Sequence, residues 1–204
     1  MLQVSASTRK MGLPSEADVR AAVEAAVDAA LSGTSESPVA PAPSPVKESG
    51  PASGDSIAIG ADHGGFPLKE KLAFKLRESG HTVVDCGTGS QESVDYPDFA
   101  HAVAEKVASG DVRWGIVVDG AGIGSAMVAN KVPGVRAALC YDLSSARNSR
   151  EHNHANVLTL GAGLIGANLA WQIVQEWLAT EWGGDRHARR IEKITAVERR
   201  YLKA

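Results

Sequence analysis

The segment from Trp114 to Ser125 combines residue types that can hold an anion and move a proton. It reads WGIVVDGAGIGS, so an apolar run ends at Asp119 and glycines follow at every second position. The apolar run predicts a buried parallel strand, and the glycines allow a tight turn into a helix. A strand, a glycine loop and a helix N-terminus together expose backbone N–H groups that suit a phosphate or an oxyanion. Asp119 stands at the carboxyl end of the strand, where α/β folds place their chemistry.

The residues alone leave other interpretations of this segment open. Asp119 can simply cap the following helix, with the glycines only making a turn. The segment from Gly120 does not match the dinucleotide-binding fingerprint G-x-G-x-x-G, because Ser125 occupies the last position. Asp142 nevertheless lies where the ribose-binding acid of such a site would. A Walker loop is excluded because no Gly-Lys-Ser/Thr sequence follows the turn. We therefore expect this loop to bind the phosphate of a small molecule.

Polar residues also follow the other predicted strands. Asp62 and His63 follow the first strand on a glycine turn, and the second strand leads to Tyr96. A helix after the fourth strand ends with His152 and Asn153, and the last helix adds a basic cluster of Arg186, His187, Arg189 and Arg190. We expect these residues to meet at the carboxyl edge of one sheet. Taken one at a time, each of these residues could instead have a purely structural role, as a helix cap, an aromatic ring in an interface, a charge at a helix end or part of a solvent-exposed helix face.

The elements that position these residues alternate between strands and helices over residues 55–204. The predicted strands are Ser56–Gly60, Thr82–Asp85, Trp114–Asp119, Val135–Cys140 and Val157–Leu160. The predicted helices are Pro67–Ser79, Asp98–Ser109, Gly124–Lys131, Leu143–His152, Ala167–Thr180 and Arg186–Leu202. This alternation predicts a single folded α/β domain with a doubly wound, five-stranded parallel sheet, which is Rossmann-like.

Two segments of different composition precede this domain. Residues 1–33 contain one predicted amphipathic helix, over 15–31, in which four apolar side chains recur at helical spacing: Val19, Val23, Val27 and Leu31. Residues 34–54 are rich in Pro, Ser, Ala and Gly, which predicts a flexible linker that buries no core.

The composition is that of a mildly acidic globular chain. Its 204 residues carry a formal net charge of −3, and 44% of them are hydrophobic. No basic stripe precedes Arg186, so we expect no nucleic acid as a partner. No apolar run reaches membrane-spanning length, and the N-terminus lacks the apolar core of a signal peptide, which predicts a cytoplasmic protein with no membrane partner. Cys86 and Cys140 fit a reducing compartment, and the six histidines show no metal-ligand spacing.

Residues 55–204 resemble the family of ribose-5-phosphate isomerase B and the galactose-6-phosphate isomerase subunits. The motifs that carry the resemblance are GADHGGFPLK from Gly60, DYP from Asp95, GxGIG from Gly120, ANKVPGVRA from Ala129, SAR from Ser145, REHNxANVL from Arg150 and RHxxR from Arg186. The resemblance implies an aldose–ketose isomerase that moves a proton between C1 and C2 of a phosphorylated sugar through an enediolate. It implies no cofactor or metal, and a homodimer or higher homo-oligomer whose active sites are shared between subunits.

The resemblance also assigns roles to individual residues. It implies His152 for ring opening, Asp62 for orienting the sugar hydroxyls and a base at the position of Asp119, whose carboxylate is a normal base for enediol chemistry. The implied substrate-binding residues are His63, Tyr96, Gly120, Ala121, Gly122, Gly124, Ser125, Asn153, Arg186 and Arg190. Among them, the N–H groups of Gly120 to Gly124 would cradle the oxyanion, whereas His63 and the two arginines would hold the phosphate.

The chain departs from the family pattern at four site positions. Asp119 stands where these ribose-5-phosphate isomerases commonly have a cysteine base, and Ala121 stands in place of a threonine. Ser125 replaces a glutamate found in some relatives, and Gly163 replaces a phosphate-binding arginine. One type of galactose-6-phosphate isomerase subunit also carries an aspartate at the cysteine position. Three hypotheses stay open: a ribose-5-phosphate isomerase with Asp119 as base, an isomerase of another pentose or hexose phosphate, and a catalytically impaired binding or structural subunit.

The N-terminal helix over 15–31 resembles the short helices that target enzymes into bacterial microcompartments. The resemblance implies a shell or cargo protein as its partner and a location inside such a compartment. The plain alternatives are a disordered tail or an expression artefact.

Overall fold

The computed structural model describes residues 15, 17, 20–25 and 55–201. Residues 17 and 20–25 are helical, within the helix predicted over 15–31. Arg20 and Glu24 form an exposed ion pair one turn apart, with 3.5 Å between Nε and Oε1. The rest of that helix and the linker predicted over 34–54 lie outside the described residues.

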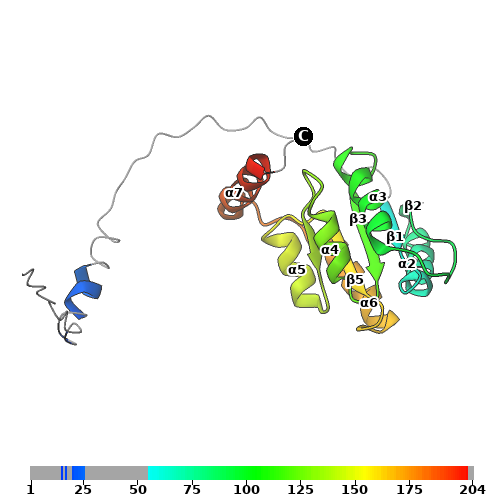
Figure 1. The fold of residues 1–204 in the computed structure, drawn as a ribbon, viewed down its shortest axis with the longest axis horizontal. Coiled ribbons are helices and arrows are strands. Elements are labelled where there is room, and N and C mark those ends of the chain that lie inside the picture. The colour runs from blue at the N-terminus through cyan, green and yellow to red at the C-terminus, as the bar shows by residue number, and fades with distance from the viewer. Residues whose placement is uncertain (1–14, 16, 18–19, 26–54, 202–204) are drawn as a thin grey trace, which may run out of the picture. The chain divides into compact units, whose positions relative to one another are not determined.

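A five-stranded, all-parallel sheet forms the centre of residues 55–201 (Figure 1). Its strands are β1 (Ser56–Ala61), β2 (Thr82–Asp85), β3 (Trp114–Asp119), β4 (Ala137–Leu139) and β5 (Val157–Gly161), in the order β2-β1-β3-β5-β4. The predicted doubly wound α/β fold is confirmed. The chain winds outward in both directions from the centre, so the strand order reverses between β1 and β3, and ligands of open α/β sheets bind at such a switch point.

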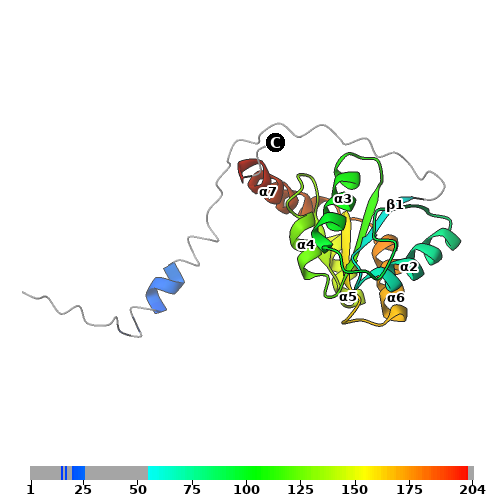
Figure 2. The same ribbon diagram turned by 45° about the vertical axis from the view of Figure 1, so that its right-hand side comes forward.

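Helices cover both faces of the sheet (Figures 1 and 2). The helices are α2 (Phe66–Glu78), α3 (Tyr96–Ala108), α4 (Ile123–Ala129), α5 (Leu143–Glu151), α6 (Ala167–Ala179) and α7 (Asp185–Tyr201). Helices α3 and α4 pack on one face, whereas α2, α5 and α6 pack on the other. The last helix, α7, extends from the end of the sheet where the strands begin and lies outside both layers (Figures 1 and 2).

The core consists of two apolar layers separated by the sheet. Side chains such as Ile59 and Ile116 lie with α2 and α6 in one layer, and alternate residues such as Ala58 and Val117 lie with α3 in the other. Each strand therefore buries both faces, which explains why the central strands read as continuous apolar runs in the sequence.

The fourth strand is shorter than the predicted Val135–Cys140. Just before it, Arg136 N–H donates to the side-chain Oδ1 of Asn156 at 2.7 Å, in place of a backbone carbonyl that a longer strand would have used. The Asn130 side chain exchanges two bonds of 2.9 Å with the backbone of Ala137, the first residue of the strand. Regular pairing of β4 with β5 consequently begins only at Ala137.

Candidate functional site

Two loops meet at the switch point, where β1 and β3 end side by side. Asp62 begins the first loop, and its buried carboxyl accepts a hydrogen bond from Gly65 N–H at 2.9 Å. Because Gly65 is the N-cap of α2, Asp62 has the structural role of stabilising the turn into that helix. A Cβ added at Gly64 would lie 3.8 Å from the backbone nitrogen of Gly120, which places the second loop directly beside the first.

The second loop is organised by Asp119, the last residue of β3. The Asp119 side chain is only 5% exposed. Its Oδ1 accepts hydrogen bonds from Ala121 N–H, at 2.7 Å, and from Gly122 N–H. Its Oδ2 accepts from Ser125 N–H, at 3.1 Å, and from the Ser125 hydroxyl. Gly122 has a φ of 78°, a left-handed conformation that favours glycine and turns the chain into α4.

These four donors match the four lone-pair sites of a carboxylate. In this structure Asp119 thus caps the turn into α4. The N–H groups of Ala121 and Gly122, which were expected in an oxyanion cradle, donate to the Asp119 side chain instead. Within the described residues, the N–H groups of Gly120, Ile123 and Gly124 are the members of the expected cradle that do not donate to Asp119. To accept a proton, Asp119 must release one donor, and the Ser125 hydroxyl is the one that a side-chain rotation can turn away.

Aromatic side chains flank the glycine loop. The Tyr96 ring at the start of α3 lies directly against α4, because a Cβ added at Gly124 would be 2.5 Å from Tyr96 Cζ. The half-buried His63 ring is held by the backbone of Val94, with 3.1 Å between His63 Nδ1 and the carbonyl oxygen. On the other side, Tyr141 O–H donates to the carbonyl of Ala121 at 2.6 Å. Tyr141 was not among the predicted site residues, although it directly follows the predicted fourth strand and so could have been found.

A second group of predicted site residues surrounds the start of α7. His152 and Asn153 follow the end of α5, and Arg186 and Arg190 lie in the first turns of α7. The His152 ring stacks on His187, with 4.4 Å between centroids and 13° between planes. Arg186 Nε donates to His187 Nε2 at 2.9 Å. Burial and the neighbouring His152, Arg186 and Arg190 side chains lower the pKa of His187.

The expectation that all these residues meet at one sheet edge is wrong for a single chain. Helices α5 and α6 return the chain from the carboxyl edge of the sheet to its amino edge, so residues that follow them lie at the amino edge. The carbonyl of Asn156, just after the His152 turn, accepts a hydrogen bond from Gly115 N–H at the beginning of β3. Asp119 stands at the other end of that strand, about 13 Å away at roughly 3.3 Å per residue.

One chain therefore presents two separate clusters. The carboxyl-edge cluster is Asp62, His63, Tyr96 and Asp119 with its loop. The amino-edge cluster is His152, Asn153, Arg186 and Arg190. The first has the loop and the carboxylates suited to proton transfer, whereas the second has the cations suited to a phosphate.

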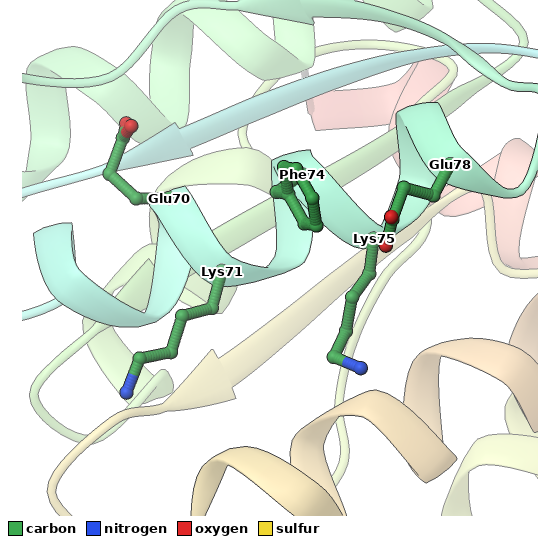
Figure 3. A pocket seen from close by; sticks show the side chains of 5 residues that line it. All are labelled: Glu70, Lys71, Phe74, Lys75 and Glu78. Atoms are coloured by element: carbon green, nitrogen blue, oxygen red, sulfur yellow. The ribbon is translucent and has the colours of Figure 1, made fainter.

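Two hollows are present on the surface of residues 55–201. A hollow of about 270 Å³ lies at the amino-edge cluster and is lined by Asn130, Arg136, Ala137, Ala138, Ser149, Asn153, Ala155 and Ile194. A second, of about 320 Å³, lies on the outer face of α2 around the exposed Phe74 ring, between charged side chains of the same helix (Figure 3). None of the predicted site residues lines this second hollow.

Neither a metal cluster nor a membrane-spanning helix occurs in the part of the chain that the structure describes. No three His, Cys, Asp or Glu side chains there come close enough to hold a metal ion. No helix there is both long and apolar enough to cross a bilayer.

Comparison with known proteins defines the class. Residues 57–194 match the ribose/galactose isomerase family. The chain belongs to this family of sugar-phosphate isomerases, as the resemblance of its motifs indicated.

Particular relatives are similar over nearly their whole length. Ribose-5-phosphate isomerase B of Escherichia coli is 46% identical over 144 residues, which cover 71% of this chain and 97% of that protein. D-erythrulose-4-phosphate isomerase of Pectobacterium atrosepticum is 43% identical over 146 residues, covering 70% of this chain and 95% of the relative. The solved structure of ribose-5-phosphate isomerase B from Clostridium thermocellum is 51% identical, with a TM-score of 0.71, over 72% of this chain and 99% of the other.

Proposed function

We propose that this protein is an aldose–ketose isomerase that converts ribose 5-phosphate to ribulose 5-phosphate. The observation that carries the proposal is a buried carboxylate on an N–H-rich loop at the switch point of this fold, in a chain from the ribose/galactose isomerase family. Relatives named ribose-5-phosphate isomerase B support the choice of substrate. A related structure from Mycoplasma genitalium, 40% identical, carries bound ribulose 5-phosphate.

In the proposed mechanism, Asp119 is the base. After the Ser125 hydroxyl turns away, Asp119 Oδ2 takes the proton from C2 of the open-chain aldose, and the C–H electrons form the enediolate. The proton on the C2 hydroxyl passes to O1, and the same carboxyl returns the first proton to C1, so that the C2 carbonyl of the ketose forms. His152 assists ring opening, Asn153 and Asp62 orient hydroxyls, and N–H groups of the loop stabilise the oxyanion, each good donor contributing about 3–4 kcal/mol.

The phosphate is proposed to bind to His63, Arg186 and Arg190. Guanidinium groups form charge-assisted hydrogen bonds with phosphate oxygens, so the arginines would contribute most of the binding energy. Since His63 lies at the carboxyl edge and the arginines at the amino edge, one chain cannot enclose a single pentose phosphate with both. We therefore propose a homodimer in which each site combines the carboxyl-edge cluster of one protomer with the amino-edge cluster of its partner. Higher homo-oligomers of such dimers are compatible with this arrangement.

One observation favours a second candidate, a sugar-phosphate-binding subunit without turnover. All four lone-pair sites of Asp119 already have donors, so its carboxylate is well placed to hold the loop and poorly placed to take a proton. The amino-edge cations would still bind a phosphate in such a protein.

The substrate is tested by incubating the full-length protein with a panel of aldose phosphates and measuring the ketose formed. The panel contains ribose 5-phosphate, a hexose phosphate and a tetrose phosphate, the last because one relative is a D-erythrulose-4-phosphate isomerase. Fastest turnover of ribose 5-phosphate supports the proposal. Faster turnover of another sugar reassigns the substrate, and binding without any ketose supports the non-catalytic subunit.

We further propose that residues 15–31 direct this otherwise cytoplasmic enzyme into a bacterial microcompartment. An amphipathic helix with small apolar side chains is marginal alone and gains stability in a groove or against sister helices. Fusing residues 1–33 to an unrelated protein should transfer association with a shell or cargo protein. Equal association by the isomerase without residues 1–54 would contradict this role.

A further inference from the structure

The turn that carries His152 and Asn153 is held by the segment that leads into α7. His154 has a φ of 49°, which is uncommon for a residue other than glycine, so surrounding contacts must stabilise it. Its carbonyl accepts a hydrogen bond from Arg136 Nε at 2.9 Å, and its N–H donates to the carbonyl of Arg150 at 3.0 Å. The His154 ring stacks on Trp182, with 4.7 Å between centroids and 10° between planes.

The same segment makes two more contacts with the turn. Gly183 N–H donates to the carbonyl of Glu151 at 2.9 Å, directly before His152. Three residues beyond Gly184, His187 stacks on the His152 ring and accepts a hydrogen bond from Arg186. Two parallel ring stacks and a backbone hydrogen bond therefore join the end of α5 to the start of α7.

We propose that Trp182 is a positioning residue for the amino-edge cluster. Through its stack on His154 it fixes the His152 turn relative to Arg186, so that the ring-opening histidine and the phosphate-binding arginine keep one spacing. The catalytic part of this inference rests on the isomerase function proposed above, whereas the geometric part does not. Among the ring stacks of the described residues, Trp182 stacks on His154 and on no predicted substrate-binding residue. It therefore acts through His154.

A half-buried, neutral His154 ring suits this role. Burial lowers the pKa of His154 to about 4, and the positive charges of Arg136, Arg150 and Arg113 act in the same direction. The His154 ring is therefore uncharged near neutral pH. It stacks on the Trp182 indole without adding a positive charge beside the arginine side chains.

The test compares three variants of the full-length protein: Trp182→Ala, Trp182→Phe and Trp171→Ala. Trp171 is a matched control, since this half-buried tryptophan of α6 faces Lys75 of α2. We expect Trp182→Ala to lower kcat/KM for ribose 5-phosphate about tenfold, because small misplacements of positioned groups are costly. Trp182→Phe should stay within about twofold of wild type, since a phenyl ring can replace the stack. Trp171→Ala should leave kcat/KM unchanged.

Histidine NMR on the same proteins supplies a second measurement that needs no turnover. In Trp182→Ala, the His152 and His187 ring signals should shift and the His154 pKa should rise toward its ordinary value, while thermal unfolding stays cooperative. His154→Asn, which tolerates the left-handed backbone, should shift the His152 and His187 signals in the same way. Unshifted His152 and His187 signals in a folded Trp182→Ala protein would overturn the proposal. If the wild type is inactive but the His152 and His187 signals shift in Trp182→Ala, the positioning role of Trp182 stands and only the proposed isomerase function is contradicted.

Discussion

At the scale of single residues, the identity of the group at position 119 decides what the loop can do. A carboxylate at this position holds three backbone N–H groups and one hydroxyl. The sequence correctly placed Asp119 at a strand end beside a glycine loop. The sequence could not decide whether Asp119 acts as a base or as a helix cap, because that depends on which groups the carboxylate oxygens face.

Replacing Asp119 by Asn tests both roles. The amide oxygen can still accept from Ala121 and Gly122, but the amide nitrogen would face Ser125 N–H, which leaves a buried donor without an acceptor at a cost of about 1–3 kcal/mol. We also expect kcat to fall about 10²–10⁴-fold with little change in KM, since the base is lost. Steady-state kinetics well below the melting temperature separate the two effects.

The matched control is Asp142→Asn, because the exposed Asp142 carboxylate accepts Ser145 N–H at 2.7 Å as the N-cap of α5. Asparagine caps helices about as well as aspartate, so this variant should resemble wild type. A destabilised Asp119→Asn protein with a wild-type rate would show that Asp119 is only a cap.

The half-buried His154 ring predicts a pH dependence of stability. Its folded-state pKa is about 4, below the ordinary value of 6.5, so the unfolded chain binds more protons between these values. Stability contributed by neutral His154 is therefore present above about pH 6.5 and is lost as the pH falls toward 4. Urea unfolding of wild type and His154→Asn over this range should show a steeper acid loss in wild type. Parallel curves would mean that His154 is not buried in its neutral form.

At the scale of elements, the strands were predicted well because both-face burial leaves an unbroken apolar run. The fourth strand was overestimated, since the Asn156 side chain replaces backbone pairing at Arg136, near the beginning of the predicted strand. The placement of His152 and Arg186 beside Asp119 failed for a different reason. In a βαβ unit the helix runs back along the sheet. A residue that follows the helix therefore lies at the amino edge, whereas the strand before the helix ended at the carboxyl edge.

The packing of α3 against α4 predicts a clash at Gly124. A Cβ there would lie 2.5 Å from Tyr96 Cζ, whereas a Cβ at Gly120 would meet nothing within 4 Å. We expect Gly124→Ala to destabilise the fold by about 1–3 kcal/mol, and Tyr96→Ala in the same chain to relieve most of that loss. Chemical denaturation of the single and double variants measures this, with Gly120→Ala as the control. A stable Gly124→Ala protein would show that Tyr96 moves aside freely.

At the scale of the whole molecule, the two clusters at opposite edges predict complementation between inactive subunits. Asp119→Asn damages one cluster and His152→Ala the other, so a mixed dimer holds one intact site and one doubly damaged site. If subunits exchange randomly, half of the dimers are mixed, and activity should recover to about a quarter of wild type. Activity assays after co-refolding the two variants measure this recovery. No recovery, despite mixed dimers seen by mass spectrometry, would place each site within one chain.

The central claim is that this protein moves a proton at C2 of an aldose phosphate, and deuterium exchange tests it most directly. Ribose 5-phosphate is incubated with the full-length protein in deuterated water and followed by NMR. We predict that deuterium enters C2 of ribose 5-phosphate and C1 of the ribulose 5-phosphate formed, and that Asp119→Asn abolishes both signals. Saturable binding of ribose 5-phosphate to the wild-type protein without any deuterium incorporation would contradict the isomerase and leave a sugar-phosphate-binding subunit.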